Sequence, residues 1–233
     1  MSLILSPVSA YGIHPSSELR ELFLSKPYQG ATPKNAKLIV VGNDANYSSE
    51  ISDHPFFELI LQYHADGVAF WKKHLIHHPF LHSRYPFNKN IGGVTYHRNF
   101  SKLGLDSSFA DKTSFVELLN VPTIGNTGQN KNLFFEMMDI DHLNWLEESL
   151  LGGKKKFVLV NQTLSRNISI IAKKLGVMTK FERLLSGQKP GTIAYRSASI
   201  VLFNGYSFSY TVTNKYLASL SSLIRSFEFE QAS

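Results

Sequence analysis

The segment Lys37–Tyr47, with the sequence KLIVVGNDANY, constrains the fold of this chain more than any other stretch. Its apolar run from Leu38 to Val41 is typical of a strand buried on both faces of a parallel sheet. Gly42 then permits a turn, and Asp44 follows. Because ligands of open α/β sheets bind just beyond the carboxyl ends of the strands, Asp44 is a candidate for chemistry. The alternative is that Asp44 only caps the next segment, as Asp often does.

Further apolar runs that end in polar turns predict three more strands, at Ser114–Leu119, Lys156–Val160 and Ser199–Phe203. Helical patterns lie between or beside these strands: Ser16–Leu24, a helix from about Pro55, Gly67–Ile76, Asp141–Leu151, Thr163–Gly176 and a closing helix after Asn214. Strands separated by helices require crossover connections. We therefore predict an α/β fold with a central four-stranded parallel sheet flanked by helices. No linker or repeat divides the chain, so residues 1–233 are predicted to form a single domain.

Composition excludes several classes of site. The 233 residues include no cysteine, which rules out disulfides, thiolate zinc sites and iron–sulfur clusters and is compatible with a reducing cytoplasm. No apolar run is long enough to cross a membrane, and the N-terminus lacks the basic and apolar regions of a signal peptide. We expect a cytoplasmic monomer that makes no membrane contact.

The distribution of charge points to a polyanionic partner. The net charge is +6, and residues 67–105 contain no Asp or Glu. That stretch carries Lys72, Lys73 and Arg98 among interleaved aromatic residues and histidines. Basic surface with interleaved aromatics is typical of nucleic-acid-binding proteins. The alternative is a mildly basic surface that faces only solvent.

Two short motifs resemble those of the uracil-DNA glycosylase superfamily. The sequence GNDANY at 42–47 resembles the family motif GQDPYH, and LLNVPT at 118–123 resembles LLNTVLT. Phe70 and Trp71 are similar to a Phe-Trp pair of the mismatch-specific branch. The resemblance implies a cofactor-free DNA glycosylase, a monofunctional hydrolase that releases uracil or another deaminated or mispaired base in DNA repair.

The sequence departs from the family pattern at two places. Ala45 and Asn46 stand where the first motif has Pro and Tyr. The last family motif, HPSP, contains a histidine, whereas residues 204–211 read NGYSFSYT and contain none. In the family that histidine donates a hydrogen bond to the departing base, so its absence predicts a slow enzyme.

The resemblance also assigns roles to residues. Asp44 would stabilise the oxocarbenium-like transition state and orient the attacking water. Asn120 would read the base edge, because an amide offers a donor beside an acceptor, although a turn cap is the alternative. We assign Asn43 and Asn46 to base binding as well. Phe57, or its neighbour Phe56, would stack on the flipped base unless it is plain core. Contacts to DNA are assigned to Tyr206, Ser207, Phe208 and Ser209, and to Lys72, Lys73 and Arg98.

His74, His78 and His82 recur every four residues, a spacing that aligns metal ligands on a helix. Pro79 interrupts that helix and no carboxylate lies nearby in the sequence, so we predict no metal site. Two other functions remain open besides a DNA glycosylase. One is a catalytically degenerate, glycosylase-like nucleic-acid-binding protein, and the other is an N-glycosidase that acts on a nucleoside or on RNA.

Overall fold

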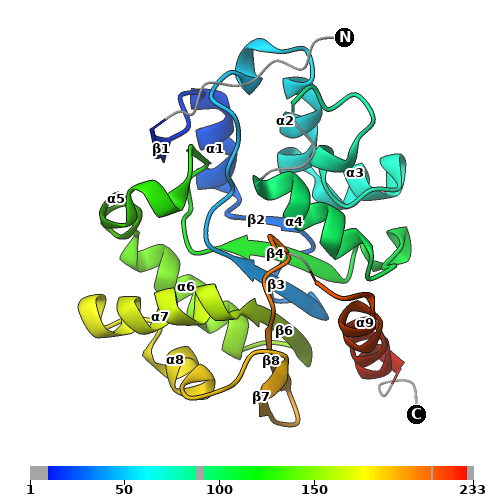
Figure 1. Ribbon diagram of the computed structural model, residues 1–233, viewed down its shortest axis with the longest axis vertical. Helices are drawn as coiled ribbons and strands as arrows, with labels where there is room; N and C mark the ends of the chain where they lie inside the picture. Colours follow the sequence, from blue (N-terminus) through cyan, green and yellow to red (C-terminus); the bar gives the residue numbers. More distant parts are fainter. Residues whose placement is uncertain (1–9, 88–91, 211, 230–233) are drawn as a thin grey trace.

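A six-stranded sheet runs through the centre of the computed structural model, which describes residues 10–87, 92–210 and 212–229 (Figure 1). The strand order is β2-β4-β3-β6-β8-β7. In chain order the strands are β2 (Tyr28–Gly30), β3 (Leu38–Gly42), β4 (Thr113–Glu117), β6 (Lys156–Asn161), β7 (Thr192–Arg196) and β8 (Ile200–Gly205). A separate antiparallel pair joins β1 (Gly12–Ile13) to β5 (Thr123–Ile124).

The prediction of a four-stranded, wholly parallel sheet is wrong, because the sheet is mixed and has six strands. The four predicted strands are its inner strands, β4-β3-β6-β8, and they pair in parallel. The edge strands β2 and β7 pair antiparallel to their neighbours. Neither edge strand has an apolar run: β2 contains only three residues, and most of β7 faces solvent. Strands of this kind leave little pattern in a sequence.

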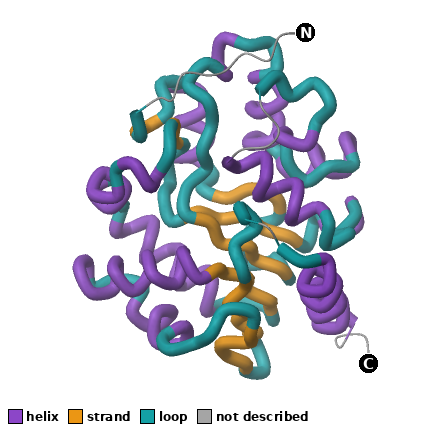
Figure 2. Tube along the Cα trace, viewed as in Figure 1, coloured by secondary structure: helices purple, strands orange, loops and turns teal. Residues whose placement is uncertain are grey.

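Residues of the inner strands alternate between two apolar layers, one on each face of the sheet. In β3, Ile39 and Val41 face one layer, whereas Leu38 and Val40 face the other. The first layer is covered by α5 (Lys131–Glu136), α6 (Ile140–Leu151), α7 (Gln162–Leu175) and α8 (Thr179–Leu185). The second is covered by α3 (Gly67–His74), α4 (Gly92–Ser101) and α9 (Asn214–Phe229). Figure 2 shows the two groups of helices on either side of the strands.

A third apolar cluster lies beside the second layer and supports the segment after β3. It contains residues of α1 (Ser17–Ser25), α2 (Phe57–Ala65) and the 3₁₀ turn Pro79–Leu81, packed around Tyr47. Ser16 caps α1, since its hydroxyl accepts a hydrogen bond from the Leu19 amide at 3.2 Å.

The predicted helices are present, with ends that differ by a few residues, and three helices were missed. These are α4 and the short helices α5 and α8. Gly92 and Gly93 at the start of α4 concealed its apolar period. In the part of the chain that the structure describes, no helix is long and apolar enough to cross a membrane. The first nine residues, on which the signal-peptide prediction rests, lie outside the described part.

Buried histidines should make the fold sensitive to acid. Burial lowers the pKa of His77 to about 3, whereas in the unfolded chain this ring takes up a proton below pH about 6.5. Stability should therefore fall as the pH drops from 6.5 towards 3, by about 2 kcal/mol from this ring between pH 7.5 and pH 5. We expect His77→Gln to reduce the loss of unfolding free energy over this range by that amount, measured by urea denaturation. The partly exposed His54, changed to Gln, is the control and should retain the wild-type pH dependence.

Candidate functional site

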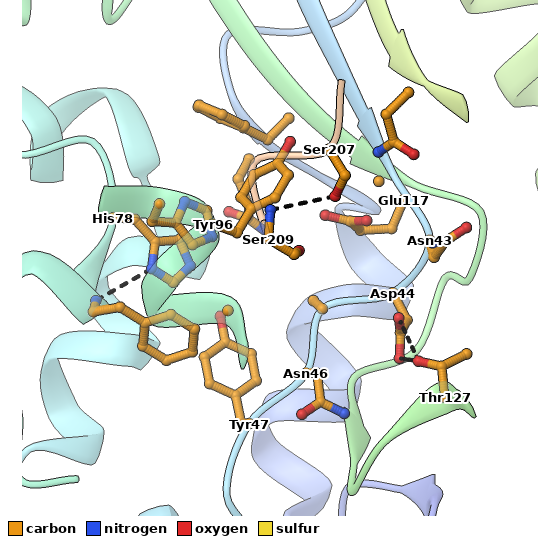
Figure 3. Close-up of a pocket in the computed structure, with 18 of the residues that line it drawn as sticks. Asn43, Asp44, Asn46, Tyr47, His78, Tyr96, Glu117, Thr127, Ser207 and Ser209 are labelled. Atoms are coloured by element: carbon orange, nitrogen blue, oxygen red, sulfur yellow. Dashed lines mark hydrogen bonds between the residues drawn. The ribbon is translucent and has the colours of Figure 1, made fainter. Parts of the chain in front are cut away.

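A cavity of about 480 Å³ opens at the carboxyl ends of the inner strands (Figure 3). The loop after β3 contributes Asn43, Asp44 and Asn46, and the end of β4 contributes Glu117. The opposite wall is formed by aromatic and imidazole rings from four segments: Tyr47, Tyr63, His78, Phe80, Tyr96 and His97. The edge of the sheet that the sequence analysis selected therefore does carry a cavity.

Asp44 is held by hydroxyl groups from three separate segments. Its Oδ2 accepts hydrogen bonds from Thr123 Oγ1 at 2.6 Å and from the Tyr11 hydroxyl at 3.1 Å. Thr127 Oγ1 lies 3.2 Å from both carboxylate oxygens. Burial raises the pKa of Asp44, and these three hydrogen bonds oppose that rise. Asp44 is thus not a cap, because its described partners are side-chain hydroxyls and not backbone amides.

Pairing between short segments places these hydroxyls. The Tyr47 amide donates to the Thr123 carbonyl oxygen at 2.9 Å, and the Thr123 amide donates to the Ala45 carbonyl oxygen at 2.9 Å. Asn46 Nδ2 adds a bond to Thr123 Oγ1 at 3.1 Å. The loop after β3 is therefore tied to the segment that follows β4.

Glu117 is a second acid at the site, and the sequence motifs did not predict it. It lies opposite Gly42 in the parallel pairing of β3 and β4. A Cβ at Gly42 would collide with Glu117 Oε2, so the carboxyl group occupies the space that the glycine leaves open. Burial, and then the nearby charge of Asp44, raise the pKa of Glu117 well above its usual range. An acid inside the otherwise apolar run SFVELL was the signal that could have revealed it.

Three of the rings in the cavity wall, those of Tyr47, His78 and His97, stack on one another. His78 stacks on His97 with centroids 3.6 Å apart, and Tyr47 stacks on His78 at 6.4 Å. His78 Nδ1 accepts a hydrogen bond from the Phe80 amide at 3.2 Å, so the neutral ring carries its proton on Nε2. Burial lowers the pKa of both His78 and His97, which keeps these rings neutral.

His74, His78 and His82 do not come together as ligands of one metal ion. Within the described ranges, no group of three His, Asp or Glu side chains is placed to hold a metal ion. His74 and His82 are neighbours, with ring centroids 5.6 Å apart, whereas His78 turns into the cavity wall. The helix of α3 ends at His74, so the regular spacing is not carried by one helix.

The structure brings some of the predicted base-binding residues together and leaves others out. Asn43 and Asn46 line the cavity beside Asp44. Asn120 does not line it; its Nδ2 donates to Asp139 Oδ2 at 3.0 Å, next to the start of α6. Phe57 is also absent from the lining, because its ring packs in the third apolar cluster and stacks on His14 at 6.5 Å. Aromatic contact to a ligand would come instead from the rings of the opposite wall.

The segment after β8 reaches the cavity only in part. Ser207 and Ser209 line it, whereas Tyr206 is half exposed beside an adjoining hollow. Phe208 is buried against Tyr96 and Phe100, so as it stands it is core and not a group that could enter DNA.

The predicted basic residues lie outside the cavity. Lys73 and Arg98 are exposed on α3 and α4. Lys72 is exposed too, and its Nζ pairs with Asp111 Oδ2 at 3.1 Å. An exposed pair of this kind is weak, but it leaves less of the Lys72 charge available to a phosphate.

In comparisons with known proteins, the chain matches no protein-family model, no curated protein and no solved structure.

Removing the shortest hydrogen bond of Asp44 should raise the pKa of its carboxyl further. We expect this for Thr123→Val, because the 2.6 Å bond to Oδ2 stabilises the charged form. The pKa can be measured by NMR titration of the Asp44 carboxyl carbon. Thr113→Val is the matched control, since the buried Thr113 hydroxyl has no hydrogen-bond partner among the described residues. If the pKa of Asp44 is the same in wild type and in Thr123→Val, the Thr123 hydrogen bond does not stabilise the charged form of Asp44.

Proposed function

We propose that this chain is a monofunctional DNA glycosylase that hydrolyses the N-glycosidic bond of uracil or another deaminated or mispaired base. The observation that carries the proposal is Asp44, which lines a cavity of about 480 Å³ at the carboxyl ends of the parallel strands. Cavities of this size bind small molecules, and a flipped nucleotide requires a pocket of this kind. The aromatic wall opposite Asp44 offers rings to stack on the base. The motif GNDANY supports the same function through its resemblance to glycosylases.

Asp44 would take part in two steps of this reaction, the breaking of the glycosidic bond and the attack of water. As the bond from C1′ to the base nitrogen breaks, positive charge develops on the sugar, and a carboxylate beside the sugar stabilises it. The same carboxylate orients the attacking water, takes a proton from it and passes this proton to the departing base. The products are a free base and a C1′ hydroxyl. No lysine lines the cavity in the described part of the chain, which favours water over an amine as the nucleophile.

A second candidate function is a glycosylase-like protein that binds nucleic acid without catalysis. The position of Asn120 favours it, since the amide that should read the base bonds Asp139 outside the cavity. Binding of base-containing DNA without release of any base is the outcome expected of that protein. A cytoplasmic location and a monomeric state are part of the proposal and rest on the sequence composition.

We expect Asp44→Asn to abolish base release while DNA binding and fold are retained, because a buried carboxylate should contribute more to catalysis than to folding. The measurement uses oligonucleotides with uracil opposite guanine, uracil opposite adenine, hypoxanthine and a natural mismatch, followed by alkaline cleavage. Asp53→Asn, at an exposed Asp outside the cavity, is the control and should release base at the wild-type rate. Base release by Asp44→Asn at the wild-type rate would contradict the role of Asp44.

Binding should weaken with salt, and the exposed charges of α3 and α4 should supply part of the dependence. Replacing Lys73 and Arg98 with Ala should flatten the slope of log affinity against log salt by up to about two phosphate contacts. Adding Lys72→Ala should change the slope less, because Lys72 is paired with Asp111. Fluorescence anisotropy across a salt series measures the slope.

The control for this measurement replaces Lys173 and Lys180, which are exposed on helices α7 and α8 that cover the opposite face of the sheet. We expect the control to retain the wild-type slope. Equal slopes for the α3/α4 variant and the wild type would show that DNA does not contact this basic surface.

A further inference from the structure

One oxygen of the Glu117 carboxyl group is buried without a partner: Oε2 has no hydrogen bond to any described residue. The backbone carbonyl oxygen of Glu117, in contrast, has a partner, because it lies 2.9 Å from His142 Nε2. Burying an unpaired polar group costs stability, so the side chain is an unusual feature to retain in a strand.

Space has been kept for this group. Gly42 stands opposite Glu117, and any side chain there would collide with the carboxyl oxygen. Figure 3 shows Glu117 directed toward Tyr96 and Ser209, while Asp44 faces Thr127. The two carboxyl groups thus occupy different parts of one cavity.

The surroundings of Glu117 favour a neutral carboxyl group. The charged group that acts on it is Asp44, from the loop after β3. A charge on Glu117 would in turn raise the pKa of three tyrosines nearby: Tyr47 from the same loop, Tyr63 from α2 and Tyr96 from α4. The neutral rings of His78 and His97 share the cavity, and no Lys or Arg of the described residues lines it. Without a cation nearby, burial holds the proton on Glu117.

We propose that Glu117 is a catalytic residue that donates a hydrogen bond from its neutral carboxyl group to a carbonyl oxygen of the departing base. This inference rests on the proposed function and names the substrate class more closely: bases with a ring carbonyl, such as uracil and hypoxanthine. Glu117 would supply the donor that residues 204–211 lack, since they contain no histidine.

The reaction then balances as follows. The C1′–N bond breaks and its electron pair moves onto the base, where the carbonyl oxygen bonded to Glu117 carries part of the charge. Water forms the new C1′–O bond and gives a proton to Asp44, which passes it to the base nitrogen. Glu117 keeps its proton throughout, so its contribution is the stabilisation of developing charge.

The test compares Glu117→Gln and Glu117→Leu with wild type in single-turnover release of uracil and hypoxanthine. Removing a preorganised donor typically costs on the order of 10²–10³ in rate, and we expect this loss for Glu117→Leu. Glu117→Gln keeps a donor that cannot ionise, so it should retain more of the rate than Glu117→Leu. Gly42→Ala should lower the rate as well, because it displaces the carboxyl group.

The pH profile separates a catalytic from a structural role. In wild type the rate should fall on the alkaline side as Glu117 loses its proton, and Glu117→Gln should remove this fall. The nearby tyrosines do not cause an alkaline fall in rate below pH about 10. That is the ordinary pKa of tyrosine, and burial raises the pKa of Tyr47, Tyr63 and Tyr96 above it. Glu148→Gln, at an exposed Glu of α6, is the control and should keep the wild-type profile. Urea denaturation verifies that each variant is folded.

The outcomes are distinct. A wild-type rate and pH profile in both Glu117→Leu and Glu117→Gln would overturn the inference while the proposed function stands. An alkaline fall that persists in Glu117→Gln would also overturn it. If the wild-type protein releases no base from any substrate, the proposed function is wrong and the inference falls with it.

Discussion

The parallel pairing of β3 with β4 is the constraint on which the site depends. It sets Gly42 opposite Glu117, and the missing side chain of the glycine leaves the space that the carboxyl group occupies. Asp44 lies two residues after Gly42 in the chain, so two acids far apart in sequence line the same cavity at one edge of the sheet. The two apolar layers that cover the sheet keep this register in place, because a slip by one residue would turn every buried side chain to the wrong face.

The two acids are the same kind of group in different surroundings. Burial raises the pKa of both carboxyl groups, but Asp44 receives hydrogen bonds from three hydroxyls, which oppose this rise, while Glu117 Oε2 has no described partner. Environments that differ in this way separate the protonation of neighbouring carboxyl groups. The proposed division of labour, with a charged group beside the sugar and a neutral one beside the base, follows from this difference.

Local patterns predicted the elements well where burial was continuous. The four apolar runs became the inner strands, and the helix predicted over Ser16–Leu24 is α1, with Ser16 as its N-cap. The edge strands and the helices α4, α5 and α8 were missed, since they are short, exposed or begin at glycines. An apolar period is recognisable only over several turns or a continuous buried run, and elements as short as β2, α5 and α8 or as exposed as β7 do not provide one.

By itself, the sequence determined the inner strands, the α/β class and the place of Asp44 at a strand end, because these follow from local apolar runs and turn residues. Only the tertiary structure decided which side chains share the cavity. Asn120 follows strand β4 and Phe57 begins helix α2, so both were expected at the site. In the structure the Asn120 side chain bonds Asp139, and Phe57 packs in the third apolar cluster. Glu117 belongs to the site because β4 pairs with β3, which sets Glu117 opposite Gly42. Pairing between distant segments sets these positions, and no local pattern encodes it.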